Sequence, residues 1–94
     1  MASVYILYSI SADLFYIGCT SDLEVRVRYH LTKEFQNSFT TKYADWELFF
    51  EIPDLTMRQA RKIETHIKKM KSRKYILDLK NYPDISKRLI AKYM

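Results

Sequence analysis

Residues 3–19 read SVYILYSISADLFYIGC, and the predicted fold is built around this stretch. Residues 3–9 are rich in β-branched and aromatic side chains and contain no breaker, which is typical of a strand. Residues 9–13 carry the small polar side chains of a turn, and residues 14–19 resume the strand pattern. Two strands joined by so short a loop predict an antiparallel hairpin.

The segment after the hairpin predicts a first helix. Ser21 and Glu24 have the spacing of a capping box, so a helix should start there and run to about His30. Residues 32–44 show no clear period and are expected to form a loop. Residues 46–52, WELFFEI, mostly alternate and predict a third strand, which Pro53 is expected to end.

The last third of the chain predicts helices. Thr56 and Gln59 repeat the capping-box spacing, and a long helix should follow to about Met70. Its apolar positions recur at steps of three and four: Met57, Ala60, Ile63, Ile67 and Met70.

A second helical segment should cover residues 73–79. The sequence Asn81-Tyr82-Pro83 should end it, and Asp84 can cap a last short helix. The predicted order is ββαβα followed by further helices. This is an α+β fold, with a small antiparallel or mixed three-stranded sheet flanked by helices, in one domain over residues 1–94.

Composition and charge narrow the class of protein. The chain has 94 residues, of which 48% are hydrophobic, and this predicts a single globular domain. One cysteine, Cys19, allows no internal disulfide, so we expect a reducing, cytoplasmic setting. We expect no signal peptide, since no basic region precedes an apolar stretch, and no membrane span, since no apolar run approaches about 20 residues.

The charge is unevenly distributed along the chain. Residues 1–56 hold 4 basic and 8 acidic side chains, whereas residues 57–94 hold 12 basic and 3 acidic ones. A basic half of this kind favours a polyanionic partner such as nucleic acid, although it is also typical of a solvated helix surface.

Charged residues on faces expected to be apolar are the first candidates for a site. Arg26 and His30 fall on the stripe defined by Leu23 and Val27, and Glu64 falls among the apolar positions of the long helix. An inward carboxylate usually meets a cation or an arginine, because burying an unpaired charge is costly. Two interpretations stay open: a structural Glu64–Arg26 salt bridge with an ordinary half-buried histidine, or a site for phosphoryl transfer.

The spacing of these residues resembles that of the GIY-YIG nucleases. Residues 16–30, YIGCTSDLEVRVRYH, contain the second motif, Tyr-Ile-Gly, unaltered, with Arg26 and His30 at family spacing. Residues 3–5, Ser-Val-Tyr, stand where the family has Gly-Ile-Tyr, so the glycine of the first motif is missing. Residues 61–69, RKIETHIKK, are similar to the helix that carries the family's metal-binding glutamate, and Lys42-Tyr43 before Trp46-Glu47-Leu48 resembles the short bacterial branch.

The resemblance covers roughly residues 3–80 and implies a function. It implies one Mg²⁺ or Mn²⁺ on Glu64, with Tyr5 or Tyr16 as general base for water and the other tyrosine orienting water or phosphate. Arg26 and His30 would hold the scissile phosphate. Gly18 would allow an unusual φ or a close backbone approach, and Asn81 is matched to the family's last polar residue.

The partner that the resemblance implies is nucleic acid, DNA more readily than RNA. The candidate phosphate contacts are basic residues: Lys42, Lys62, Lys69, Lys71, Arg73 and Lys74. Two other functions remain open: a binding module that keeps the nuclease fold with little turnover, and a structural protein with a buried polar network. The edge strands of a three-stranded sheet are also compatible with a dimer.

Overall fold

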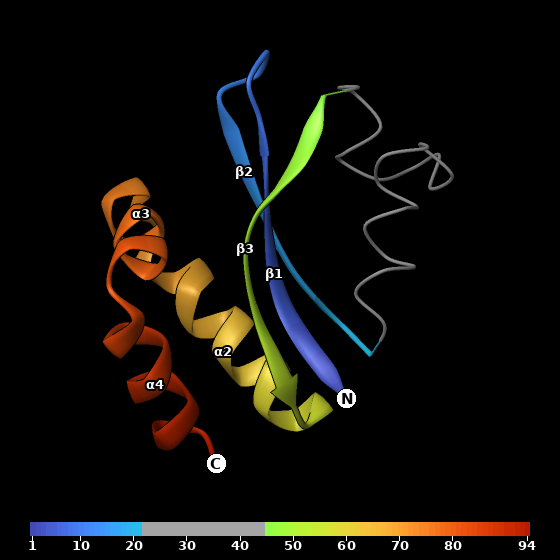
Figure 1. Ribbon diagram of the computed structural model, residues 1–94, viewed down its shortest axis with the longest axis vertical. Coiled ribbons are helices and arrows are strands. Elements are labelled where there is room, and N and C mark those ends of the chain that lie inside the picture. Colours follow the sequence, from blue (N-terminus) through green and yellow to red (C-terminus); the bar gives the residue numbers. More distant parts are fainter. Residues whose placement is uncertain (22–44) are drawn as a thin grey trace.

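The computed structural model describes residues 1–21 and 45–94, which form one antiparallel sheet and three helices (Figure 1). The elements are β1 (Ala2–Ser9), β2 (Leu14–Thr20), β3 (Trp46–Leu55), α2 (Met57–Met70), α3 (Arg73–Asn81) and α4 (Pro83–Lys92). The strand order is β2-β1-β3. The predicted α+β class is confirmed, and the sheet is antiparallel throughout the described residues. The helix expected from Ser21 to about His30 and the loop expected over residues 32–44 lie outside the described residues.

The hairpin predicted from the opening stretch of sequence is confirmed. β1 and β2 pair in an uninterrupted antiparallel register, in which Tyr5 is opposite Gly18 and Leu7 is opposite Tyr16. The turn between the strands places Asp13 at a φ of 54°, in the left-handed region that aspartate tolerates better than most residues. This register decides which side chains of the two tyrosine motifs share a face of the sheet.

The third strand is longer than predicted, and the expectation that Pro53 ends it is wrong. β3 runs to Leu55, and its pairing with β1 shifts register between Val4–Ile52 and Ala2–Leu55, where β3 has one extra residue. Pro53 and Asp54 lie in this bulge, and Asp54 has a φ of 62°. Proline is tolerated at bulges and on edge strands because its missing N–H donor is not needed there.

The helix boundaries follow from their caps. The Thr56 side chain accepts a hydrogen bond from the backbone N–H of Gln59, and Gln59 reaches back, so the predicted capping box is confirmed. Ser72 caps α3 in the same way, through the backbone N–H of Tyr75.

Two details of the predicted helices are wrong. Asp84 lies in the first turn of α4, whose N-cap is Tyr82 with Pro83 at the start of the helix, so Asp84 does not cap it. Met70 is 45% exposed instead of belonging to the buried stripe of α2. It is the last residue of α2, just before the chain turns at Lys71 in a left-handed C-cap, and it does not share the burial of the stripe.

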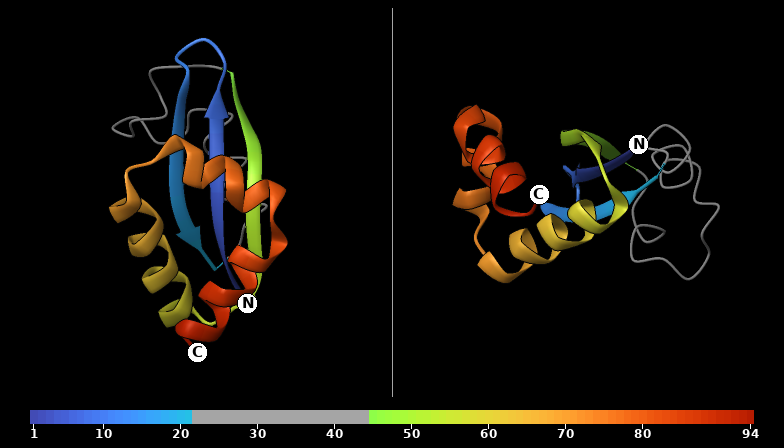
Figure 2. Two further views of the ribbon diagram at one scale, coloured as in Figure 1. Left: turned by 90° about the vertical axis from the view of Figure 1, so that its left-hand side faces the viewer. Right: turned by 90° about the horizontal axis from the view of Figure 1, so that it is seen from below.

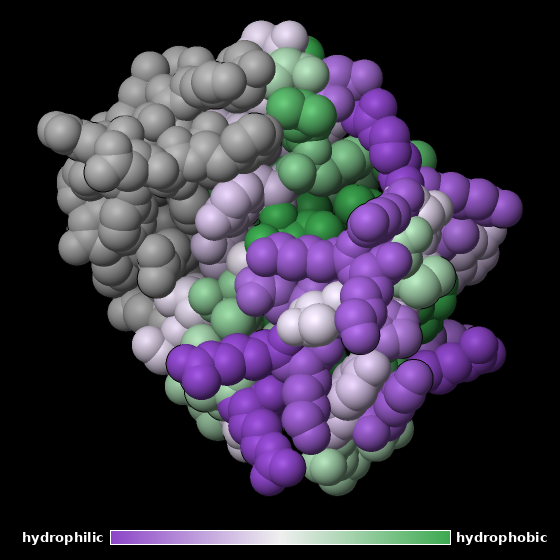
Figure 3. Space-filling model, turned by 180° about the vertical axis from the view of Figure 1, so that it is seen from behind, coloured by the Kyte–Doolittle hydropathy of each residue, from purple (hydrophilic) through white to green (hydrophobic). Residues whose placement is uncertain are grey.

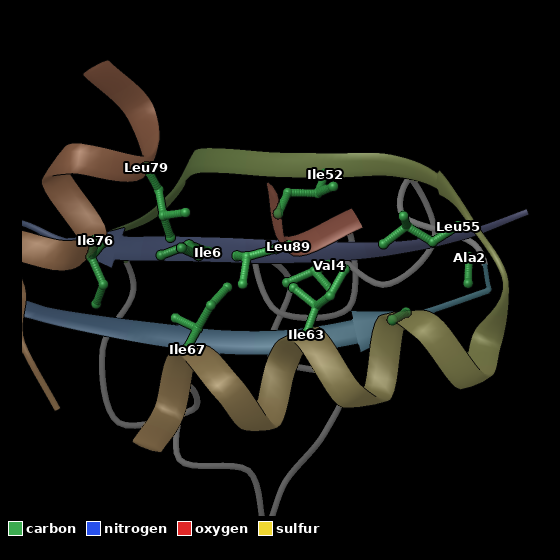
Figure 4. Packing of buried hydrophobic residues seen from close by; sticks show 11 residues of the cluster. Ala2, Val4, Ile6, Ile52, Leu55, Ile63, Ile67, Ile76, Leu79 and Leu89 are labelled. Carbon is green, nitrogen blue, oxygen red and sulfur yellow. The ribbon is translucent and has the colours of Figure 1, made fainter. Parts of the chain in front are cut away.

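The main core lies between the sheet and the helices. All three helices pack against the same face of the sheet (Figure 2). Val4, Ile6 and Ile52 of the sheet meet Ile63 and Ile67 of α2, with further apolar side chains from α3 and α4 (Figure 4). Among the helices of the described residues, none is long and apolar enough to cross a membrane.

A second cluster lies on the opposite face of the sheet. It consists of Tyr5, Leu7 and Trp46, each at most 2% exposed, with the partly buried Tyr16 packed against them. Because side chains alternate between the faces of a strand, Tyr5 and Leu7 point away from the helices that cover Val4 and Ile6.

Asp45 connects the hairpin turn to the start of β3. Its carboxylate accepts hydrogen bonds from the hydroxyls of Ser9 (2.6 Å) and Ser11 (2.9 Å) and from the backbone N–H of Ser11 (2.7 Å). These hydrogen bonds, led by the one from Ser9, lower the pKa of Asp45 from 3.8 to about 2. The charged form is therefore favoured in the folded state.

We expect this link to contribute to stability above about pH 4 and to be lost as the pH falls toward 2. The Asp45 pKa is depressed on folding, so the unfolded chain binds the proton first. Asp45→Asn should be less stable than wild type at neutral pH, and the two melting temperatures should converge in acid. Thermal melts across this range check the prediction, with Asp54→Asn as the control; a gap that does not depend on pH would contradict it.

Candidate active site

The two motif tyrosines lie next to each other on the face of the sheet that points away from α2. Their ring centroids are 6.4 Å apart and the rings are stacked with an interplanar angle of 28°. Tyr16 also makes an edge contact with Trp46, at 6.3 Å. Tyr5 is buried and Tyr16 is partly exposed.

Gly18 makes room for the ring of Tyr5. A Cβ atom at position 18 would lie 2.5 Å from the Tyr5 hydroxyl oxygen and 2.6 Å from Cζ, closer than any real contact. No glycine of the described residues has a positive φ. The glycine is therefore required for close approach, one of the two roles expected from the sequence, and not for an unusual backbone conformation.

Glu64 lies on the other side of the sheet, where α2 covers β2. Its Oε1 atom accepts a hydrogen bond from the thiol of Cys19 at 3.7 Å, and its Oε2 atom is 3.6 Å from the ammonium of Lys68. The Glu64 side chain is 19% exposed. Burial and the adjacent carboxylate raise the pKa of the Cys19 thiol, so this residue stays a protonated donor.

Strand β2 lies between the two halves of the candidate site. Cys19, which contacts Glu64, is the immediate neighbour of Gly18, over which the Tyr5 ring lies. β2 is an edge strand of the sheet formed by the described residues. The tyrosines and Glu64 therefore do not share one cleft formed by the described residues, because they lie on opposite faces of the same edge strand.

Glu64 fits the requirements of a hard divalent cation. Its carboxylate offers the oxygen ligands that Mg²⁺ prefers, and it retains exposed surface for the waters that this ion keeps. Among residues 1–21 and 45–94, no group of three or more His, Cys, Asp or Glu side chains is placed to hold a metal. A single carboxylate suits an ion whose other ligands are water and substrate phosphate.

Four further predicted site residues lie outside the described residues or at the far edge of the sheet. Arg26, His30 and Lys42 lie outside the described residues. Asn81 is the exposed last residue of α3, and its neighbours Lys80 and Pro83 line a groove with residues of β3. Since β3 is at the opposite edge of the sheet from β2, this placement does not support the assignment of Asn81 to the site.

The predicted phosphate contacts of the C-terminal half are exposed, but one of them is already paired. Lys62, Lys69, Lys71 and Lys74 are exposed to solvent on α2, its C-terminal cap and α3. The guanidinium of Arg73 instead donates to both carboxylate oxygens of Asp13, at 2.6 and 3.0 Å. This pairing, together with the Tyr8 hydroxyl, holds the Asp13 pKa well below its usual range.

Three polar contacts were not predicted from the sequence. Cys19 supports Glu64, and Lys68 pairs with it from one helical turn away. His66 is partly buried, and its Nδ1 atom is 2.9 Å from the hydroxyl of Tyr93. The spacing of Lys68 four residues after Glu64 could have indicated the ion pair. The contacts made by Cys19 and Tyr93 join residues of different secondary-structure elements, so residue spacing could not have indicated them.

The family model of the GIY-YIG catalytic domain matches residues 1–76 of the chain. The matched region includes both tyrosine motifs, Arg26 and Glu64. The chain belongs to the GIY-YIG nuclease superfamily, whose fold is of nuclease type. Comparisons with curated proteins and with solved structures give no significant match.

Proposed function

We propose that this protein is a metal-dependent endonuclease that hydrolyses phosphodiester bonds in nucleic acid, DNA in preference to RNA. Family membership supports the reaction class. The observation that carries the proposal is the carboxylate of Glu64 beside Cys19 on β2, one residue from the glycine that accommodates Tyr5. The proposed setting is the cytoplasm.

The residues have separate roles in the proposed mechanism. Glu64 would hold one Mg²⁺ or Mn²⁺, which stabilises negative charge on the phosphate when bound. Tyr5 or Tyr16 would take a proton from the attacking water, and the other would orient water or phosphate. A tyrosine can act as a base only where nearby positive charge stabilises its phenolate.

Arg26 and His30 complete the proposed site as contacts to the scissile phosphate. The planar guanidinium of an arginine can donate two parallel hydrogen bonds to phosphate oxygens, which a lysine cannot do. Their assignment rests on motif spacing within the region that matches the family.

Conversion of closed circular DNA to the nicked form tests the proposal, because hydrolysis of one bond is sufficient to produce it. Purified protein should nick the DNA in Mg²⁺ and should not do so with a chelator in place of the metal. Equal nicking in both conditions would contradict metal dependence, and absence of nicking in Mg²⁺ would contradict the assigned activity.

The second candidate is a nucleic-acid-binding module with little turnover. The ion pair between Lys68 and Glu64 favours it, because a cationic side chain 3.6 Å from the carboxylate competes with a metal. Lys68 is more than half exposed, however, and a surface ion pair of this kind is worth little. The two candidates differ in the nicking assay but not in binding.

The lysines of the C-terminal half provide a test of the nucleic-acid partner. Exposed side chains cover the face of the molecule on which α2 lies and are predominantly hydrophilic there (Figure 3). Reversing Lys69, Lys71 and Lys74 to glutamate should raise Kd for every sequence alike. It should also flatten the salt dependence, by about one unit of slope for each phosphate that is no longer neutralised.

The measurement is fluorescence anisotropy of a labelled duplex over a range of salt concentrations. Lys80 and Lys87, which line a groove with β3, provide a double reversal as the control. Unchanged affinity and slope in the triple variant would mean that these lysines only keep the protein soluble.

A further inference from the structure

An aromatic groove lies at the hairpin end of the sheet. It has a volume of about 440 Å³ and is lined by Tyr8, Phe15, Phe49, Arg73 and Leu77. The strands extend past α3 toward the hairpin turn, so the helices of the described residues leave this end of the sheet uncovered (Figure 2). The groove therefore joins one aromatic side chain from each strand to one side of α3.

The aromatic rings of the groove contact one another across the strands. Phe15 of β2 is tilted against Tyr8 of β1, with centroids 4.8 Å apart, and meets Phe49 of β3 edge to face at 5.1 Å. A register shift between β1 and β3 places Phe49 in a bulge, a feature that changes the direction of a side chain. The two phenylalanines are only partly buried and Leu77 is 45% exposed, so apolar surface stays open to a ligand.

The guanidinium of Arg73 is held in place beside these rings. It donates hydrogen bonds to both carboxylate oxygens and to the backbone carbonyl of Asp13. Its Cζ atom lies 5.2 Å from the centroid of the Phe15 ring. Because Asp13 compensates its charge, Arg73 is better suited to stacking through its flat face than to contacting a phosphate.

The charges near the rings favour a ligand that carries negative charge. Lys74 is exposed and is three residues before Leu77, which places it about one turn away on α3. The ammonium of Lys80 lies 4.5 Å from the centroid of Phe49 and is engaged by that ring. Unpaired nucleic-acid bases have flat faces and are joined by phosphates, and proteins bind them with aromatic rings next to positive charge.

The groove lies on the same face of β2 as the contact with Glu64. Phe15 and Cys19 are four residues apart on this strand, so their side chains point to the same face. The distance along the strand is about 13 Å, which is roughly the rise of four stacked nucleotides. A nucleic-acid strand with one base in the groove can therefore extend to Glu64, which Cys19 contacts.

We propose that this groove binds an unpaired base of the nucleic acid, which stacks on the ring of Phe15 beside the guanidinium of Arg73. The inference rests on the proposed function for its partner. It adds a base-binding site a few nucleotides from the cleaved bond, and it favours substrates that have an unpaired segment there.

The experiment measures the fluorescence anisotropy of two labelled DNA probes, with a chelator present so that the DNA stays intact. One probe is a blunt duplex, and the other is the same duplex with a single-stranded thymine overhang. Phe15→Leu combined with Phe49→Leu keeps the groove apolar and removes both rings. The double variant should raise Kd for the overhang probe by about fivefold or more, as expected for one lost stacking contact, and leave Kd for the blunt duplex unchanged.

Phe50→Leu is the matched control and should change neither Kd. Phe50 is another partly buried phenylalanine of β3, and it lines a different groove. A thermal melt checks the fold of each variant. If the double variant unfolds, Leu77→Glu takes its place, because this exposed position accepts a charge without loss of core packing. A carboxylate there should weaken binding of the overhang probe more than binding of the duplex.

Three results would overturn the inference in distinguishable ways. An equal effect on both probes, or an effect on neither, would exclude the groove as a base site while leaving the nucleic-acid partner in place. A wild-type dimer that the double variant converts to a monomer in sedimentation, with both Kd values unchanged, would make the groove an interface between copies of the chain. Absence of binding to either probe would contradict both the groove and the proposed partner.

Discussion

Glu64→Gln should leave the fold intact and lower the rate of Mg²⁺-dependent cleavage by about two orders of magnitude or more. The substitution keeps the volume of the side chain and removes its charge, and a hard cation binds a neutral amide less well than a carboxylate. Removing one group that stabilises the charge of a transition state typically lowers the reaction rate by a factor of this size. The site is only partly buried, so the amide can remain solvated.

The rate is best measured under single-turnover conditions, with a thermal melt of each variant. Glu47→Gln is the matched control, because Glu47 is an exposed glutamate on β3, at the far edge of the sheet. Cleavage at the wild-type rate would rule out Glu64 as the metal ligand. If Glu64→Gln unfolds instead, the carboxylate is structural, as the salt-bridge interpretation of the sequence holds.

Gly18→Ala should lower both the stability of the fold and the rate of cleavage. The new methyl group would overlap the ring of Tyr5, which is 2% exposed and stacked on Tyr16, so the ring has little room to move. Overpacking of this kind typically costs about 1–3 kcal/mol. Displacing a catalytic group by about 1 Å can cost about 100-fold in rate.

A double-mutant cycle separates steric overlap from other effects of the alanine. The stability cost of Gly18→Ala, from denaturant unfolding, should nearly vanish in a Tyr5→Ala background, because the overlapping ring is then absent. An equal cost in both backgrounds would mean that position 18 acts through the backbone.

Local sequence signals predicted most of the fold. The hairpin, the capping box at Thr56 and the buried positions Ile63 and Ile67 of α2 were all predictable, because strand alternation, helix periodicity and capping are properties of neighbouring residues. The end of β3 was mispredicted, because proline ends strands only where its missing donor is needed. At a bulge on an edge strand this donor is not needed, and whether a strand lies at the edge of a sheet depends on the tertiary structure.

The candidate site was predictable as a set of residues but not as an arrangement. Motif spacing selected Tyr5, Tyr16 and Glu64, yet it could not show that they lie on opposite faces of β2. The contacts of Cys19 with Glu64 and of His66 with Tyr93 join residues 45 and 27 positions apart. Such pairs depend on how α2 packs against the sheet and against α4, which no local pattern encodes.

The most direct test of the central claim, that Glu64 holds the metal of a nuclease, is the dependence of the cleavage rate on Mg²⁺ concentration in wild type and Glu64→Gln. We predict that the wild-type rate rises from the chelator baseline to saturation. The variant should stay near that baseline over the same range while binding DNA as tightly as wild type does. Curves that coincide for the two proteins, or a wild-type rate that does not depend on Mg²⁺, would contradict the claim.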